Sequence, residues 1–153
     1  MPCSHPELAM SDIATDKYKD AVKRAVDRWR SKVEGPAKQL VKLDAEITEL
    51  EAKKPAGDDD KKKLGEAKKT YATLRKQIET ANDELRLDLM LLEPPKQTSA
   101  NEKELMTLPD FIKDLIKAKG VPLGKGVSIA PEIKFDFKAM KLKDAGLKIT
   151  WRF

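Results

Sequence analysis

Two groups of charged residues in this chain could do chemistry, and they lie far apart in the sequence. Carboxylate oxygens can hold a hard cation such as Mg²⁺, and lysines on one face of a sheet can bind phosphate or an acidic partner. The candidate partner-binding residues are Asp58, Asp59 and Asp60 in the first group and Lys134, Lys138 and Lys148 in the second.

The acidic group stands where a helix is expected to begin. Aspartates there can cap exposed backbone amides and complement their partial positive charge, so a structural role is favoured. Lys61, Lys62 and Lys63 follow at once and offset part of the negative field. The functional alternative is an acidic hairpin tip like that of regulators which enter the secondary channel of bacterial RNA polymerase. That alternative is an analogy of fold alone.

The residue types that most catalytic sites need are scarce. His5 is the only histidine and Cys3 the only cysteine, which excludes histidine-based triads, Cys–His pairs and the common zinc sites. The segment from Gly120 to Gly126 resembles a phosphate-binding loop only superficially, because no Ser or Thr follows Lys125. We therefore expect no enzymatic activity, no cofactor and no metal site.

These residues must be positioned by helices, and the clearest helical pattern runs through the middle of the chain. Apolar residues recur there at intervals of three and four, which is the repeat of a coiled-coil seam sustained for about four heptads. The members of this seam are Leu64, Ala67, Tyr71, Leu74, Ile78, Ala81, Leu85, Leu89 and Leu92.

A second seam precedes it, and residues 53–59 between the two contain the proline and glycine of a turn. Folding the chain there gives a long antiparallel helical hairpin. The expected pairs are Leu50 with Leu64, Ile47 with Ala67, Leu43 with Tyr71, Leu40 with Leu74, Val33 with Ala81 and Trp29 with Leu85. Gly35 and Pro36 interrupt the first arm, either as a joint between two helices or, as we favour, as a kink in one.

The far end of the second arm has a different composition. From Leu85 to Leu92 the residues are apolar nearly all round the helix, which is typical of a segment buried on every side. We therefore expect the main core here, at the open end of the hairpin, with the C-terminal third of the chain built onto it.

In that C-terminal third a short helix is expected from about Leu108 to Lys119, capped by Thr107, after a capping box of Ser99 and Glu102. Alternation with a period of two then predicts an antiparallel hairpin of strands over residues 133–137 and 147–153, with its turn at 143–146. Residues 127–129 are a candidate third strand, and a bulge is expected near 140–142.

Composition favours an elongated helical protein over a spherical one, because 37% of the residues are charged and 5% are aromatic. No apolar run is long enough to span a membrane, the first residues do not form a secretory signal, and the lone cysteine favours a cytoplasmic setting. The net charge of +5 comes mostly from residues 100–153, so the hairpin is electrically balanced and nucleic acid is not the favoured partner.

The sequence thus predicts a mainly α fold: a coiled-coil hairpin over residues 11–95 and a small α+β element over 100–153, with either a β-hairpin or a three-stranded sheet. Residues 1–10 are expected to be a disordered N-terminus or an expression remnant. The function favoured is a non-enzymatic protein–protein interaction module, such as an adaptor, chaperone, immunity or assembly component, with possible homodimers. The alternative is a nucleic-acid or RNA-polymerase-associated regulator.

Overall fold

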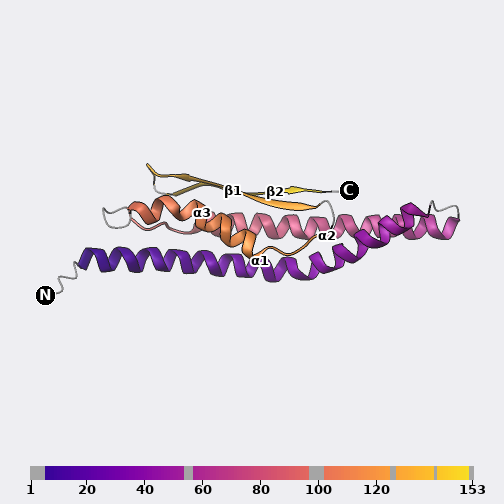
Figure 1. Cartoon of the computed structure of the whole chain (residues 1–153), viewed down its shortest axis with the longest axis horizontal. Helices are drawn as coiled ribbons and strands as arrows, with labels where there is room; N and C mark the ends of the chain where they lie inside the picture. Colours follow the sequence, from indigo (N-terminus) through magenta and orange to yellow (C-terminus); the bar gives the residue numbers. More distant parts are fainter. Residues whose placement is uncertain (1–5, 54–56, 97–101, 125–126, 140, 152–153) are drawn as a thin grey trace.

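The computed structural model of the protein contains three helices and a two-stranded antiparallel sheet (Figure 1). It describes residues 6–53, 57–96, 102–124, 127–139 and 141–151, with side chains from residue 15 onward. The elements are α1 (Pro6–Ala52), α2 (Asp58–Leu91), α3 (Glu102–Lys119), β1 (Ser128–Asp136) and β2 (Lys141–Thr150). The predicted fold class, a helical hairpin with a small C-terminal α+β element, is confirmed.

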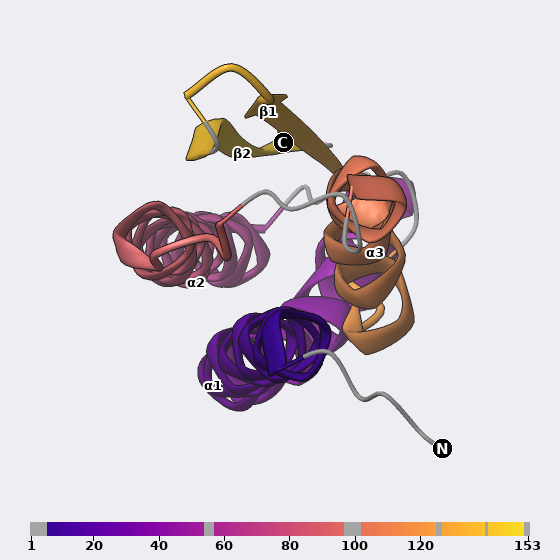
Figure 2. The ribbon, with the colours of Figure 1, turned by 90° about the vertical axis from the view of Figure 1, so that its left-hand side faces the viewer.

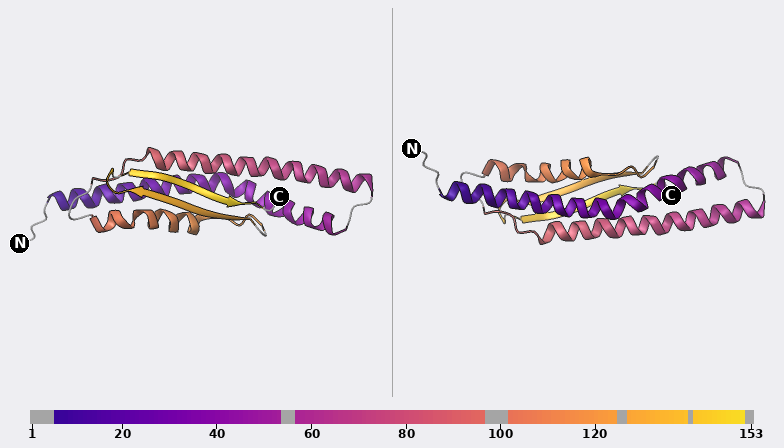
Figure 3. Two further views of the ribbon diagram at one scale, coloured as in Figure 1. Left: turned by 90° about the horizontal axis from the view of Figure 1, so that it is seen from above. Right: turned by 90° about the horizontal axis from the view of Figure 1, so that it is seen from below.

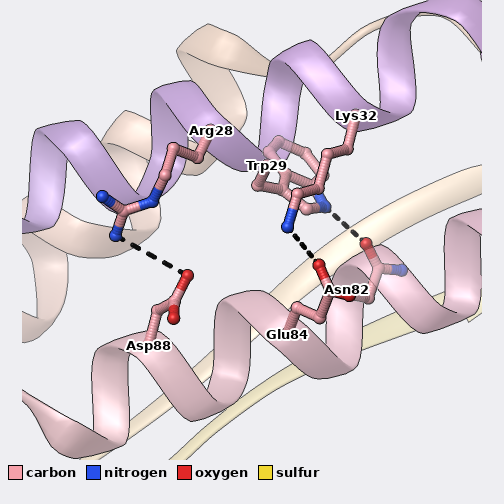
Figure 4. A network of polar contacts seen from close by, with 6 residues as sticks. All are labelled: Arg28, Trp29, Lys32, Asn82, Glu84 and Asp88. Carbon is pink, nitrogen blue, oxygen red and sulfur yellow. Dashed lines mark hydrogen bonds and ion pairs between the residues drawn. The ribbon is translucent and has the colours of Figure 1, made fainter.

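α1 and α2 form the predicted hairpin, and polar contacts between them agree with the register expected from the seams. The Trp29 indole N–H donates to the Asn82 side-chain oxygen at 2.6 Å, and Lys32 pairs with Glu84 (Figure 4). Nearer the turn, Lys68 lies 3.3 Å from Glu51. The chain therefore folds back on itself between Ala52 and Asp58, as the Pro–Gly segment predicts.

α1 is one continuous helix of 47 residues, with Pro36 inside it. The joint between two helices is thus excluded in favour of a single helix. Its second half departs from the line of the first half (Figure 1). A bend is the expected response to an internal proline, which lacks an N–H donor and whose ring displaces the carbonyl one turn earlier.

The C-terminal third does not form a base at the open end of the hairpin, as the sequence suggested. It lies along the hairpin as a second layer, and the α1–α2 turn projects beyond the end of β2 (Figure 3). α3 runs parallel to α1, with Lys19 over the Phe111 ring and Lys119 3.4 Å from Asp27.

The sheet closes the space between α2 and α3. β2 contacts α2, β1 contacts α3, and α1 contacts both α2 and α3, so the four parts surround one core (Figure 2). This arrangement explains how a sheet of two strands is stable, since an isolated hairpin of strands is marginal in water.

The turn of the β-hairpin lies at residues 137–139 and not at the predicted 143–146. Asp136 pairs with Lys141 in the ladder, whereas Gly146 pairs with Glu132 in the middle of the strands. The Asp136 side chain explains the difference, because its Oδ1 accepts N–H groups from Lys138 and Ala139 and so stabilises the turn.

Two further expectations for the sheet are corrected. Residues 128 and 129 begin β1, so they form no third strand, and the sheet of the described residues has two strands. The irregularity in the ladder falls between Lys134 and Phe135, where Lys143 is the extra residue of β2. It lies just after the predicted bulge at 140–142.

α3 begins at Glu102, six residues before the predicted start at Leu108. Thr107 lies inside the helix and its hydroxyl donates to the Glu104 carbonyl, so it does not cap the N-terminus. Pro109 is also internal. Ser99, the other half of the predicted capping box, lies outside the described residues.

The core is not concentrated at the end of α2. Leu85 and Leu89 are buried, but Leu87 is 62% and Leu91 79% exposed, so the prediction of burial on every side is wrong for this segment. Among the described elements, α2 contacts α1 and β2, so this segment is covered on the sides that face them. The largest fully buried side chains run along the whole assembly: Trp29, Leu40, Ile47, Ile78, Leu85, Leu89, Leu105, Leu108, Ile112, Ile116, Val22 and Val26.

Burial also changes the acidity of Tyr18. Removal of its phenol from water raises the pKa of Tyr18 from 10.0 to about 12. The unfolded chain releases this proton first as pH rises, so the folded form loses stability between pH 10 and about 12. Urea unfolding across this range should show that loss, and the Tyr18→Phe variant should show a smaller one.

Gly124 is the one described glycine with a left-handed backbone, at φ 105°. A Cβ at this position would also lie 3.0 Å from the Asp44 carboxylate of α1. Gly124→Ala is therefore expected to reduce the free energy of unfolding by about 1–3 kcal/mol, measured by urea titration. Gly65→Ala is the control: no atom lies near its added methyl, and it should gain up to about 1 kcal/mol of helix stability.

Candidate functional site

The three aspartates of the first candidate group occupy the first turn of α2 at the end of the hairpin, and all three are exposed. The N-cap residue is Gly57, which makes no side-chain cap, so the aspartates do not cap the helix with their own oxygens. Their remaining structural role is to complement the helix dipole. Lys61, Lys62 and Lys63 are also exposed, in the same turn and the next.

This role makes a modest prediction for the hairpin tip. Asp59→Asn should change the free energy of unfolding by at most about 1 kcal/mol, because a charge near a helix N-terminus contributes less than that at an exposed site. Thermal unfolding at low salt measures the change. A loss well above this value would show that Asp59 makes a contact beyond the helix dipole.

The lysines of the second candidate group lie on the outer face of the sheet and in its turn. Lys134 and Lys148 are exposed on the face that points away from the helices, and Lys138 is exposed in the β1–β2 turn. Acidic residues lie among them: Asp144 is the cross-strand neighbour of Lys134 in the ladder. A continuous basic stripe of the kind that follows a phosphate backbone is absent from this face of the described sheet.

The structure does not bring the two candidate groups together. The β1–β2 turn points toward the open end of the helical hairpin, away from the α1–α2 turn (Figures 1 and 3). Any function of the aspartates at the hairpin tip is therefore separate from that of the lysines on the sheet.

Sequence reasoning missed a large concave feature of the described residues. It is a groove of about 1050 Å³ between the second half of α1 and the segment 121–131, and we call it the α1 groove. Its lining is mostly apolar. The residues are Trp29, Val41, Asp44, Ala45, Thr48, Glu49, Ala52, Ile116, Lys117, Gly120, Val121, Pro122, Leu123, Gly124, Val127, Ile129 and Pro131.

One wall of the α1 groove is a second stripe on α1. Val41, Ala45, Thr48 and Ala52 follow at intervals of four, three and four, which places them on one face of the helix. All four are exposed, in contrast to the seam that Leu40 and Ile47 make with α2. α1 therefore has two helix-spaced faces, of which only one is covered here.

The inner end of the α1 groove is closed by the packing of α3 on α1. Trp29 of α1 and Ile116 of α3 are both buried and both line it. The groove thus continues the α1–α3 interface past the point where α3 ends at Lys119.

Polar groups of the α1 groove are few and are held by the fold. Asp44 is 4% exposed and its carboxylate lies beside Gly124. The Thr48 hydroxyl donates to the Asp44 backbone carbonyl at 2.7 Å. Glu49 is exposed and pairs with Lys53 at 3.0 Å. An apolar concave surface with few polar groups is suited to binding, with no nucleophile–base pair among its lining residues.

The comparisons with other proteins identify no relative. No protein-family model, curated protein or solved structure matches this chain. Within the residues that the structure describes, no cluster of three or more His, Cys, Asp or Glu side chains could hold a metal ion. None of the helices in that part of the chain combines the length and the hydropathy that crossing a bilayer requires.

Proposed function

We propose that this chain is a non-enzymatic protein–protein interaction module that binds an amphipathic helix of a partner protein in the α1 groove. The observation that carries the proposal is the exposed stripe of Val41, Ala45, Thr48 and Ala52 opposite an apolar wall. Helices that lie in grooves present apolar residues at intervals of three and four, which is the spacing of this stripe.

The place of the groove in the fold supports the proposal of a helical occupant. α3 already packs on the N-terminal half of α1 and runs parallel to it, with Phe111 near Lys19 and Lys119 near Asp27. The α1 groove begins where α3 ends, so a helix lying in it would extend the α1–α3 interface along the rest of α1. Small side chains at Ala45 and Ala52 allow two helix backbones to approach closely.

The surface chemistry favours this role over the alternative of a nucleic-acid or polymerase-associated regulator. Lysines on the sheet are interleaved with Glu132, Asp136 and Asp144, and the tip aspartates are followed by three lysines. Neither group is an uninterrupted run of one sign, whereas the groove offers an apolar surface in a helical pattern. We propose a cytoplasmic setting as well, from the single cysteine.

The experiment is a selection from a displayed library of helical peptides against the immobilised full chain. Enriched peptides should share apolar residues at positions i, i+3 or i+4, and i+7. They should bind the Ala45→Arg variant at least about tenfold more weakly, because an arginine in the groove interior loses more than about 1.4 kcal/mol of binding free energy. Fluorescence anisotropy measures the affinity.

The matched control is Ala118→Arg, which places the same side chain at an exposed helical site that does not line the groove. It should bind the enriched peptides as the original chain does. Equal binding to the Ala45→Arg variant would place the interaction elsewhere and contradict the groove. Enrichment of peptides without helical spacing would contradict a helical partner.

A further inference from the structure

A second surface, distinct from the α1 groove, combines exposed apolar residues with acidic ones at the C-terminal end of α2. Leu87 and Leu91 lie one turn apart and are 62% and 79% exposed, and Met90 beside them is 37% exposed. We call residues 83–93 the acidic end of α2, because four carboxylates and one arginine lie there. These charged residues are Asp83, Glu84, Arg86, Asp88 and Glu93.

Three of these charges already have partners within the chain. Glu84 pairs with Lys32, Asp88 with Arg28 at 3.7 Å, and Arg86 with Asp144 (Figure 4 shows the first two pairs). Asp83 and Glu93 lie outside the ion pairs of the described residues and are exposed. The apolar patch therefore has two carboxylates beside it that can meet a partner's cations.

The outer face of the sheet and its turn carry charge of the opposite sign. Five exposed lysines lie within residues 132–148, which we call the lysine face: Lys134, Lys138, Lys141, Lys143 and Lys148. Two of its three acids are engaged locally. Asp144 binds Arg86, and Asp136 accepts the amides of its own turn. Free positive charge thus dominates this face.

The acidic end of α2 and the lysine face are neighbours. The Arg86 Nε lies 3.2 Å from the Asp144 Oδ1, which joins the two surfaces directly. β2 lies beside α2 in the assembly, as Figures 1 and 2 show from two directions. A negative surface and a positive surface therefore adjoin on this molecule at the Arg86–Asp144 pair.

A surface divided in this way is complementary to itself. A two-fold rotation about an axis through the boundary brings the negative half of one copy onto the positive half of the other, twice. Lysine side chains also have apolar stems, which can cover Leu87 and Leu91 of the facing copy while their ammonium groups reach Asp83 and Glu93. A pairing of acidic ends with each other would instead oppose like charges.

We propose that two copies of this chain associate through this divided surface, with the acidic end of α2 of each copy on the lysine face of the other. The occupant is a second copy because the charges and the exposed leucines that the contact needs lie side by side on one molecule. Salt weakens the association, since the contacts between the copies are exposed ion pairs.

Sedimentation velocity at two salt concentrations provides the first test. The full chain should form dimers at about 0.02 M salt and dissociate at about 0.5 M, as the screening length falls from roughly 20 Å to roughly 4 Å. A chain that stays monomeric at low salt up to its solubility limit would overturn the proposal. So would dimers that salt does not weaken.

Charge exchange provides the decisive test. One variant carries Asp83→Lys and Glu93→Lys, so both halves are positive; the other carries Lys138→Glu and Lys143→Glu, so both halves are negative. Each alone should dimerise at least about tenfold more weakly than the original chain, by the sum of several exposed pairs. Mixed in equal amounts, they should form a one-to-one heterodimer, because both contacts are then restored.

The variants leave the internal ion pairs of the fold intact, and circular dichroism checks that each is folded. The matched control is Lys61→Glu with Lys62→Glu at the hairpin tip, which changes the same number of charges far from the divided surface and should not alter dimerisation. If the mixture stays monomeric, or if the Asp83→Lys, Glu93→Lys variant dimerises as well as the original chain, the proposed interface is wrong.

Discussion

Leu89→Asp should leave the chain mostly unfolded at 25 °C. Leu89 is 0% exposed and packs in the core between α2 and its neighbours. The change removes a buried side chain, which costs about 2–5 kcal/mol, and puts an unpaired carboxyl group in its place at a further cost of several kcal/mol. A sum of this size approaches the whole stability of an ordinary domain. Circular dichroism and urea unfolding measure the loss.

The control lies two residues along the same helix. Leu91 is 79% exposed, so Leu91→Asp makes the same chemical change on the other side of α2 and should alter stability by less than about 1 kcal/mol. If both variants unfolded to the same degree, the α2 end would be buried all round, as its composition alone suggests. A difference of several kcal/mol between them would confirm the one-sided burial.

The helical hairpin was predictable because its signal is long and redundant. Nine seam positions in the second arm set the helical face, and the proline and glycine between the arms set the turn. If one position is misassigned, the others still define the same helical face. The same reasoning failed at Leu87 and Leu91, because an apolar residue can be buried but need not be. Which side meets a neighbour depends on where α3 and the sheet lie.

The β-hairpin shows how local chemistry can be misread. Residues 143–146 contain Asp, Ala and Gly, a composition typical of turns, yet they lie within β2. The observed turn depends on one aspartate, Asp136, that accepts two backbone amides, and its neighbours Phe137, Lys138 and Ala139 have no strong turn preference. Choosing between two candidate turns requires the pairing of the strands, which a period of two does not supply.

The α1 groove was missed although its signal is present in the sequence. Val41, Ala45, Thr48 and Ala52 have helical spacing, but two alanines and a threonine are weak markers of an apolar face. They also lie between seam residues that give a stronger pattern. Reading α1 for two faces would have found the stripe. The opposite wall is built by Val121 and Val127, which lie outside the helices and strands, and by Ile129 at the start of β1. Its residues follow no common period, so only the fold brings them together.

The layered arrangement also explains why the interior contains a polar pair. α1 packs against both α2 and α3. Trp29 of α1 lies between these helices, at the inner end of the α1 groove. Its indole donates to Asn82, which is 6% exposed and occupies a core position of α2. The second amide hydrogen-bonding group of Asn82, its Nδ2, has no hydrogen-bond partner among the described residues. A polar residue buried between two helices can fix their register at a cost in stability.

Trp29→Ala should therefore destabilise the protein by about 3–5 kcal/mol, the range for emptying a large aromatic site. Trp29 is 2% exposed, and its loss would also leave the Asn82 oxygen without its donor. Trp29→Phe retains much of the volume and removes the donor, so it should lose less. Urea unfolding of the two variants separates the packing loss from the hydrogen-bond loss.

The double variant Trp29→Phe with Asn82→Leu removes both partners of this hydrogen bond. Replacing both partners of a buried hydrogen bond by apolar groups of similar shape changes the free energy of unfolding little, whereas replacing one partner leaves the other buried and unsatisfied. We expect the double variant to recover most of the stability that Trp29→Phe loses, with a coupling of about 0.5–3 kcal/mol in the cycle. Additive losses would show that the pair contributes through packing alone. If the recovered protein unfolds less cooperatively, the Trp29–Asn82 bond serves to hold α1 and α2 in one register.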